Sequence, residues 1–373
     1  MKRFFTIIIA LFVSVLSFSQ TENSNSELVY GNARTEIYLP ELKNKKVGLV
    51  CNHTSVVCGV VCGKHLADTL LDMGVNLVCL LTPEHGFQGT AKEGQLIENQ
   101  TSYNGVKVCS LYGKNKKPSK EIMQSLDVIL FDLQDVGCRF YTYISTLQYV
   151  MQACIENDRK LIVLDRPNPN NYVCGPILEP KFRSFVGLQC VPVCYGLTIG
   201  EYAQMINREN WVDTSKFCDL MVVKMQNYRR DSAYVLQIPP SPNLKSAKAV
   251  RNYPTLCLFE GTPLSVGRNT PTPFEIIGFY DENKAIKNPE QVDIHQKDLQ
   301  IEYLIRYYNI YKEKFGENMA KEKFFSRMFL LLSGSEKMKQ AIISGKSAEE
   351  IRSSWAKDIE NYEKIRKKYL IYK

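Results

Sequence analysis

The sequence lacks the short motifs that mark several common enzyme classes. It has no Gly-x-x-x-x-Gly-Lys loop, and no Gly-x-Gly-x-x-Gly follows its first expected strand. Such loops hold phosphates with backbone N–H groups, so no nucleotide cofactor is implied. There is also no Gly-x-Ser-x-Gly elbow. Its absence counts against a serine hydrolase.

Metal-binding patterns are scarce as well. The chain has only four histidines, and none form a chelating His-x-x-x-His pair. The cysteine pairs 58/62 and 190/194 are separated by three residues rather than by the two of a zinc ribbon. His53 and His85 with Asp135 would be an alternative metal set, but a hydrogen-bonding role suits these histidines better. We therefore expect no metal and no other cofactor.

The positions of the twelve cysteines do not indicate a disulfide framework. Cys51 and Cys79 lie in apolar, strand-like runs, where a thiol acts as a small hydrophobic group and bridging geometry is unfavourable. We expect thermal stability to be indifferent to reductant.

Long hydrophobic runs are missing except at the start of the chain. Lys2 and Arg3 precede an apolar run over residues 4–18, which falls short of the ~20 residues that a spanning helix needs. The run ends in Ser17-Phe18-Ser19, with small residues at the two positions that signal peptidase reads. We expect residues 1–19 to be a cleaved signal peptide and the mature protein to be exported, either periplasmic or secreted, without stable membrane insertion. A retained anchor is the alternative.

The charge balance is only mildly basic. The formal net charge is +8, and removal of Lys2 and Arg3 leaves 45 basic against 39 acidic residues, or +6. This excess suits an acidic surface or substrate. No clustered basic stripe is present, so we expect no nucleic-acid partner.

Apolar runs alternate with helical patterns in the first part of the chain. The pattern predicts strands at 46–51, 75–81, 127–133, 160–165 and 220–225, and helices at 64–73 and 141–157. Thr198-Ile-Gly-Glu201 is a capping box that opens a further helix. The alternation predicts an α/β domain over 27–235, with a parallel sheet covered by helices.

The composition changes after this domain. Residues 238–280 are rich in Pro, Gly, Asn and Thr, which indicates loops and short strands. From Leu299 onward the pattern is helical, with a second capping box at Ser347-Ala-Glu-Glu350. We expect residues 236–373 to form an auxiliary region with C-terminal helices.

Polar residues gather where the expected strands end. The sequences are Asn52-His53-Thr54-Ser55, Pro83-Glu84-His85-Gly86, Gln134-Asp135-Val136-Gly137-Cys138-Arg139-Phe140-Tyr141-Thr142-Tyr143 and Asp165-Arg166-Pro167-Asn168. Ligands bind beyond the carboxyl ends of parallel strands, so these loops should form one cleft.

Glu84 is the strongest catalytic candidate, because a carboxyl group in an apolar or crowded site can act as a general acid. Helix capping or a salt bridge is the alternative. Glu260 could supply a second carboxylate or merely brace a loop. Arg139 and Arg166 could each hold a substrate carboxylate or form ion pairs with Asp135 and Asp165 within the cleft. Tyr141 and Tyr143 could each be a sugar platform or a core residue.

These motifs resemble the exo-β-N-acetylmuramidases of the NamZ type over nearly the whole mature chain. The resemblance rests on 48–54, 83–86, 131–143, 164–169, 184–187, 196–201, 240–243, 260–262 and 366–370. It implies a Rossmann-like catalytic domain, a smaller barwin-like auxiliary region, and release of N-acetylmuramic acid from the non-reducing ends of peptidoglycan fragments. Muropeptides or disaccharides would be the partners.

The resemblance also implies that Glu84 is the catalytic acid. Asp135, Glu260 and the substrate's own acetamido group compete for the second role. The residues at which we expect substrate contacts are Asn52, His53, His85, Gln134, Arg139, Tyr141, Tyr143, Asp165, Arg166, Asn168, Asn243 and Arg268. A non-catalytic periplasmic binder of muropeptides or sugars is the competing hypothesis.

The chain departs from the family at one place. Residues 281–298 form a polar link where the family usually has a longer, strand-bearing stretch. We expect the cleft wall beyond the cleaved bond to be lower there. The alternative is a trimmed surface hairpin without consequence.

Overall fold

The computed structural model describes residues 27–58, 62–90, 102–212, 216–281, 283 and 285–373. The expected signal peptide, residues 1–19, lies outside this part. Within the described ranges, no helix has the length and apolar character needed to cross a bilayer.

A six-stranded sheet forms the centre of the first part, in the order β10-β7-β6-β1-β4-β5. Its strands are β1 (Val47–Cys51), β4 (Leu77–Thr82), β5 (Lys107–Ser110), β6 (Val128–Asp132), β7 (Lys160–Leu164) and β10 (Leu220–Val223). All neighbouring strands are parallel. The predicted parallel α/β fold is confirmed, and each predicted strand is present within a few residues.

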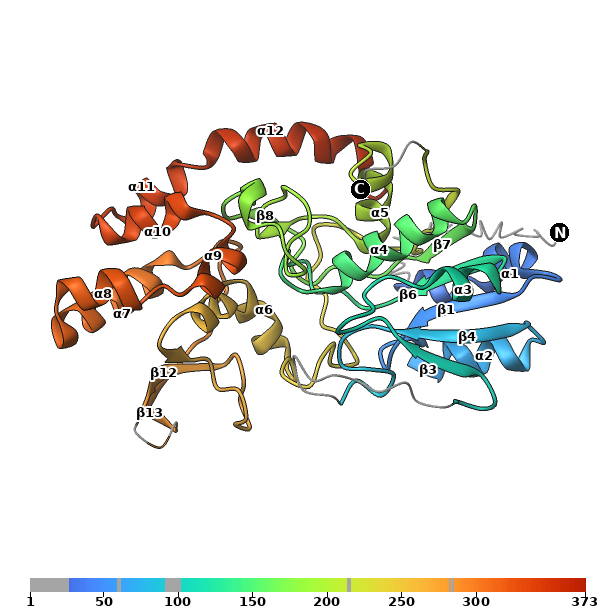
Figure 1. Cartoon of the computed structure of the whole chain (residues 1–373), viewed down its shortest axis with the longest axis horizontal. Coiled ribbons are helices and arrows are strands. Elements are labelled where there is room, and N and C mark those ends of the chain that lie inside the picture. Colours follow the sequence, from blue (N-terminus) through green and yellow to red (C-terminus); the bar gives the residue numbers. More distant parts are fainter. Residues whose placement is uncertain (1–26, 59–61, 91–101, 213–215, 282, 284) are drawn as a thin grey trace, which may run out of the picture.

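Helices cover both faces of this sheet (Figure 1). Alternate strand residues face opposite sides. Leu49, Leu80 and Leu130 pack with α1 (Thr35–Leu42) and α2 (Leu66–Asp72). Val50, Leu81 and Phe131 pack on the other side, with α3 (Lys120–Gln124), α4 (Tyr143–Glu156) and α5 (Ile199–Arg208). The inner strands are thus buried on both faces, which explains their largely apolar sequences.

The second part combines helices with a small antiparallel sheet, β11 (Leu264–Ser265), β12 (Ile276–Tyr280) and β13 (Ile286–Gln291). Its helices are α6 (Ala247–Leu256), η3 (Cys257–Gly261), α7 (Ile301–Phe315), α8 (Glu317–Lys323), α9 (Arg327–Ser333), α10 (Glu336–Ile343), α11 (Ala348–Ser353), α12 (Ala356–Arg366) and η4 (Lys367–Tyr369). The C-terminal helices are confirmed. The barwin-like character stays a prediction.

The two parts share one continuous hydrophobic core. In Figure 1, α12 crosses back over the molecule to the α/β part, and the chain ends beside α5. There Tyr362 Oη donates to the Tyr195 carbonyl at 2.7 Å, and Arg366 Nε donates to the Gly196 carbonyl at 2.8 Å. Both predicted capping boxes, at Thr198 and Ser347, are present.

Short elements complete the described structure. They are η1 (Gly31–Ala33), β2 (Val56–Cys58), β3 (Cys62–His65), β8 (Val173–Cys174), η2 (Pro180–Phe182) and β9 (Cys194–Tyr195).

Two expectations are corrected. Residues 281–298 do contain a strand, β13, which pairs with β12. Its sequence is polar and includes Pro289, because it lies at the edge of the sheet, so neither alternation nor an apolar run revealed it. The second correction concerns the cysteines, for which no disulfide framework was expected. Cys58, in the short β2–β3 hairpin, forms a disulfide. Ten other cysteines are free, most of them buried, as expected.

Candidate active site

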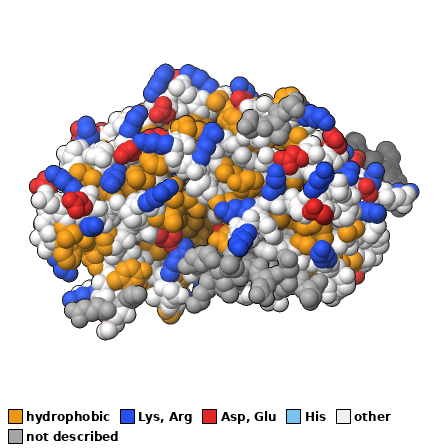
Figure 2. All heavy atoms as spheres, viewed as in Figure 1, with side chains coloured by type: hydrophobic (Ala, Val, Ile, Leu, Met, Phe, Trp, Pro, Cys, Tyr) orange, Lys and Arg blue, Asp and Glu red, His pale blue; other side chains and the backbone are white. Residues whose placement is uncertain are grey.

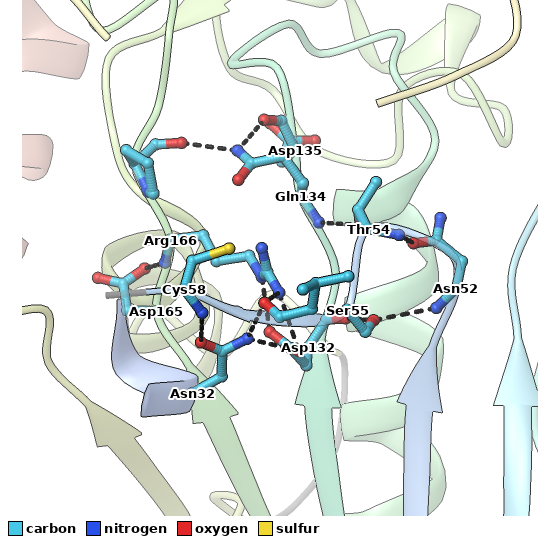
Figure 3. Close-up of polar contacts among 12 residues, drawn as sticks. Asn32, Asn52, Thr54, Ser55, Cys58, Asp132, Gln134, Asp135, Asp165 and Arg166 are labelled. Carbon is cyan, nitrogen blue, oxygen red and sulfur yellow. Dashed lines mark hydrogen bonds and ion pairs between the residues drawn. The ribbon is translucent and has the colours of Figure 1, made fainter. Parts of the chain in front are cut away.

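The topology places a crevice between β1 and β6, because the chain proceeds from these neighbouring strands toward opposite edges of the sheet. Side chains of the protein itself fill this crevice (Figure 3). Arg166 Nε lies 2.6 Å from Asp132 Oδ1, and both side chains are almost fully buried. Asn32 Nδ2 also donates to Asp132, at 3.1 Å. Arg166 therefore forms an internal ion pair, one of the two roles considered for it, with Asp132 rather than Asp165 as partner.

The amide side chains beside the crevice are also used internally. Asn52 Nδ2 donates to Tyr143 Oη at 2.7 Å. Gln134 Nε2 donates to the carbonyls of Asp135 and Pro167, at 2.8 and 2.7 Å, as Figure 3 shows for Gln134 and Asp135. Asn168 Nδ2 donates to the Leu197 carbonyl at 2.8 Å. These buried residues fix the loops to one another, and Gln134, together with Arg166, also lines a small cavity of about 10 Å³. The substrate contacts expected for them stay predictions.

Arg139 is the largest of the expected contact residues that are fully buried. Its two terminal nitrogens donate to four backbone carbonyls, those of Pro176, Val191, Leu332 and Ser333, at 2.7 to 3.0 Å. Burial lowers the pKa of Arg139 to about 10. With no exposed surface, its guanidinium is not placed to hold a substrate carboxylate, contrary to one expected role.

Asp165 is likewise turned inward. It accepts hydrogen bonds from Thr198 Oγ1 and the Gly200 amide, both at 2.8 Å, at the start of α5. Tyr372 Oη is a third donor. Burial raises the pKa of Asp165 to about 7, although these hydrogen bonds oppose the shift. The structure therefore uses Asp165 to join α5 and the chain's end to β7, rather than for a substrate contact.

A cavity of about 320 Å³ lies at the junction of the two parts. This volume is within the usual range for ligand pockets. It is lined by Glu84, His85, Tyr112, Phe140, Tyr141, Thr142, Tyr143, Val186, Ser241, Asn243, Leu244, Tyr253, Cys257, Glu260, Arg268, Phe274, Met328 and Leu332. Figure 2 shows a hollow bordered by hydrophobic side chains in the middle of the molecule. Seven of the fifteen expected site residues line this cavity: Glu84, His85, Tyr141, Tyr143, Asn243, Glu260 and Arg268.

Glu84 enters this cavity from the loop after β4. The Gly86 amide donates to the Pro83 carbonyl at 3.1 Å, and His85 has a φ of 70°. A positive φ is uncommon for a histidine and marks a constrained turn. Thr142 Oγ1 donates to Glu84 Oε2 at 2.8 Å. Thr142 is the residue before α4, so the carboxylate lies near the N-terminus of that helix. The turn and this hydroxyl together fix the direction of the Glu84 side chain.

Glu260 and Arg268 come to the cavity from the second part. Arg268 Nε donates to Glu260 Oε1, and the Arg268 guanidinium lies 5.1 Å from the centre of the Phe274 ring. The two charged side chains are 23% and 22% exposed, so a ligand can reach them. Glu260 thus lines the same cavity as Glu84. It also forms an ion pair with Arg268, which is consistent with the alternative that Glu260 braces a loop.

Two tyrosines of the cavity lining contact each other. The rings of Tyr141 and Tyr143 meet edge to face at 4.8 Å, and Tyr141 Oη donates to the Pro240 carbonyl at 2.8 Å. Asp135 does not line the cavity. It accepts hydrogen bonds from Tyr195 Oη and, at 2.6 Å, from the Gly137 amide, while its Oδ1 is buried without a hydrogen-bond partner. Burial raises the pKa of Asp135 to about 7.

His53 is not among the cavity residues either. Its Nε2 lies 2.8 Å from the Pro239 carbonyl, and burial lowers the pKa of the ring. In the described ranges, no three His, Cys, Asp or Glu side chains are grouped so that they could hold a metal ion.

Several cavity residues were missed from the sequence. Thr142 lies inside a motif that was singled out, but nothing in the sequence showed that its hydroxyl would meet Glu84. Tyr112 follows β5, the one strand of the sheet that was not predicted. Met328 and Leu332 belong to α9, far away in sequence. Only the tertiary fold brings these residues to the cavity.

Comparisons with known proteins agree with this architecture. Residues 47–248 match the model of "Exo-beta-N-acetylmuramidase NamZ, N-terminal", and residues 251–295 and 284–372 match that of its C-terminal part. The chain is 35% identical to the peptidoglycan beta-N-acetylmuramidase NamZ of Bacillus subtilis strain 168, with 90% of this chain and 89% of the relative covered.

Two crystal structures of DUF1343 family proteins from Bacteroides fragilis NCTC 9343 are also similar. They have TM-scores of 0.80 and 0.80 with 38% and 29% identity, and each covers 93% of this chain. The alignments cover 99% and 100% of those structures. Both parts of the chain match the family, and the chain therefore belongs to the NamZ family of exo-β-N-acetylmuramidases.

Proposed function

We propose that this protein is an exo-β-N-acetylmuramidase that releases N-acetylmuramic acid from the non-reducing ends of peptidoglycan fragments during cell-wall turnover. The observation that carries this proposal is the cavity in which Glu84 of the α/β part and Glu260 of the second part both lie. Membership of the NamZ family and the similarity to the peptidoglycan beta-N-acetylmuramidase NamZ of B. subtilis support it.

Glu84 is the proposed proton donor. Hydrolysis of a glycoside needs an acid that protonates the leaving oxygen as an oxocarbenium-like transition state develops. Glu84 is held by Thr142 Oγ1 at 2.8 Å, on a turn that leaves the carboxyl group in the cavity. An acid in a fixed direction loses little freedom when the substrate binds.

The second catalytic group is proposed to be either Glu260 or the acetamido group of the substrate. Glu260 lines the cavity, whereas Asp135 is buried outside its lining. Asp135 is therefore the weaker of the two carboxylate candidates.

Arg268 is proposed to bind the lactyl carboxylate that distinguishes N-acetylmuramic acid from N-acetylglucosamine. It is the one Lys or Arg among the described residues that line the cavity. Its Nε is directed at Glu260, and Phe274 supports its guanidinium plane. The planar guanidinium of an arginine is suited to binding a carboxylate through two parallel N–H···O hydrogen bonds.

The compartment is part of the proposal. Peptidoglycan lies outside the cytoplasmic membrane, and the N-terminal sequence has the pattern of a cleaved signal peptide over residues 1–19. Mass spectrometry of the protein purified from its natural source should find a mature N-terminus near Gln20. An intact N-terminus would contradict the proposed export.

The activity test compares an aryl β-N-acetylmuramide with its N-acetylglucosamine counterpart. We expect release of the aryl group from the muramide and much slower release from the glucosaminide. A muramyl disaccharide should yield free N-acetylmuramic acid. A protein that binds the disaccharide without cleaving it, while Glu84 is intact, would support the competing role of a non-catalytic binder.

A further inference from the structure

A short turn at the border of the cavity has no role in the proposed hydrolysis. Residues 184–187 form a tight turn in which the Ser184 amide donates to the Gly187 carbonyl at 3.0 Å and the Gly187 amide donates back at 2.9 Å. The tip of this turn carries Phe185 and Val186. Val186 lines the cavity, whereas Phe185 does not. The turn therefore marks a border between the cavity and the outer surface.

Phe185 is the middle member of a row of three aromatic side chains, which we call the aromatic row: Tyr112, Phe185 and Tyr149. Tyr112 lines the cavity. The Phe185 ring lies 6.2 Å from that of Tyr112, and the Tyr149 ring is nearly parallel to that of Phe185 at 6.2 Å. All three side chains are partly exposed. The aromatic row thus begins inside the cavity and continues outside it.

Lys116 adds a positive charge to this surface. Its Nζ lies 4.5 Å from the centre of the Phe185 ring, and the side chain is partly exposed. A cation over an aromatic ring is attracted to it by about 0.5–1 kcal/mol at an exposed site, which favours this position of the ammonium group. An anionic group that passes along the aromatic row would meet this ammonium group.

We propose that the aromatic row, together with Lys116, binds the saccharide that continues beyond the cleaved bond. This inference rests on the proposed function. An exo-acting enzyme holds the terminal sugar in its cavity, so the rest of the chain must leave across the border. Partly exposed aromatic rings offer flat apolar surface to the C–H faces of sugar rings. The carboxylate of a later muramic acid unit would be attracted by Lys116.

The structural alternative is that Phe185 only anchors the turn through its contact with Tyr149. Phe185→Leu separates the two roles, because leucine keeps an apolar anchor and loses the flat ring. Phe217→Ala is a matched control. Phe217 is 58% exposed and also has a cation near its ring, with Arg208 Cζ at 5.7 Å, but it lies outside the cavity lining.

The experiment measures kcat/KM of the wild type and both variants with an aryl muramide, a muramyl disaccharide and a peptidoglycan tetrasaccharide. We expect Phe185→Leu to lower kcat/KM for the tetrasaccharide about 10-fold, with little change for the aryl muramide. Lys116→Gln should act in the same direction, and its effect should vanish at high salt. Phe217→Ala should change none of these values.

The outcomes separate the inference from the proposed function. A loss that is equal for all three substrates would show that Phe185 acts only as an anchor of the turn. Unchanged kinetics of Phe185→Leu with the tetrasaccharide would also overturn the inference. A folded wild type that cleaves none of the substrates would instead refute the proposed function itself.

Discussion

The proposed role of Arg268 leads to a sharp prediction about substrate choice. Arg268→Met removes the charge and keeps much of the length of the side chain, including its contact surface toward Phe274. A hydrogen bond to a charged group is worth about 1.5–3 kcal/mol. Tenfold in rate corresponds to ~1.4 kcal/mol, so kcat/KM for the aryl muramide should fall by roughly 10- to 150-fold. The aryl glucosaminide has no lactyl carboxylate and should be affected far less.

The same substitution leaves Glu260 without its ion-pair partner, so a control is needed. An unpaired Glu260 would repel the lactyl carboxylate and enlarge the loss for the muramide. Arg268→Met combined with Glu260→Gln removes both charges. If Glu260 serves only as the counter-ion, the double variant should recover part of the muramide activity. If Glu260 is also the second catalytic group, the double variant should lose activity on both substrates.

The assay is the ratio of kcat/KM values for the two aryl glycosides, measured with wild type, both single variants and the double variant. A fall in this ratio upon Arg268→Met supports carboxylate recognition. An equal fall for both substrates would refute it and would leave Arg268 as a brace for Glu260. Arg268→Lys should be intermediate, because an ammonium keeps the charge without the planar arrangement of donors.

Four further predictions follow from the same structure. Glu84→Gln should fold normally and lose cleavage by at least ~10²-fold, and unchanged turnover would exclude Glu84 as the acid. Thr142→Val should lower kcat by ~10-fold or more with little effect on the melting temperature, since the Thr142 side chain makes no capping bond to α4, whereas Thr142→Ser should retain activity. Burial raises the pKa of Asp135 from 3.8 to about 7, so the folded state binds more protons there between these pH values and loses stability as pH rises. Asp135→Asn should therefore gain stability relative to wild type from pH 4 to pH 7, by up to ~4 kcal/mol in denaturant titrations, and a constant difference would contradict this. Reductant should lower the melting temperature of the wild type but not of Cys58→Ser, and equal sensitivity would show that the disulfide at Cys58 is not the cause.

Burial on both faces is what made the sheet predictable. Strands such as β1 and β6 are buried at every position, so their sequences are apolar, except for Asp132 at the end of β6. β5 has only four residues and begins with the exposed Lys107, so its run of apolar residues is too short to indicate a strand. β13 is polar because it forms an edge. A strand can be predicted from hydrophobicity only where both of its faces, or every second residue, meet a core.

The sequence predicted the location of the site better than the side chains that line it. The sequence indicated the loops at the carboxyl ends of the strands, and Glu84 on one of those loops does lie in the cavity. It could not indicate the direction of each polar side chain. Arg166 was placed correctly in its loop, but its partner is Asp132, the last residue of β6. Whether a buried arginine meets a substrate or a nearby carboxylate depends on distances of a few ångströms that no local pattern encodes.

Arg139 shows how a residue can matter to the cavity without lining it. Its guanidinium joins the carbonyls of Leu332 and Ser333, at the end of α9, to those of Pro176 and Val191 in the first part. Leu332 lines the cavity, and so do the residues that follow Arg139, from Phe140 to Tyr143. A buried charge with four carbonyl partners is costly to displace, because any shift leaves it without hydrogen bonds. Arg139 therefore fixes the distance between two walls that come from different parts of the chain, and the width of the cavity depends on an arginine that the substrate cannot reach.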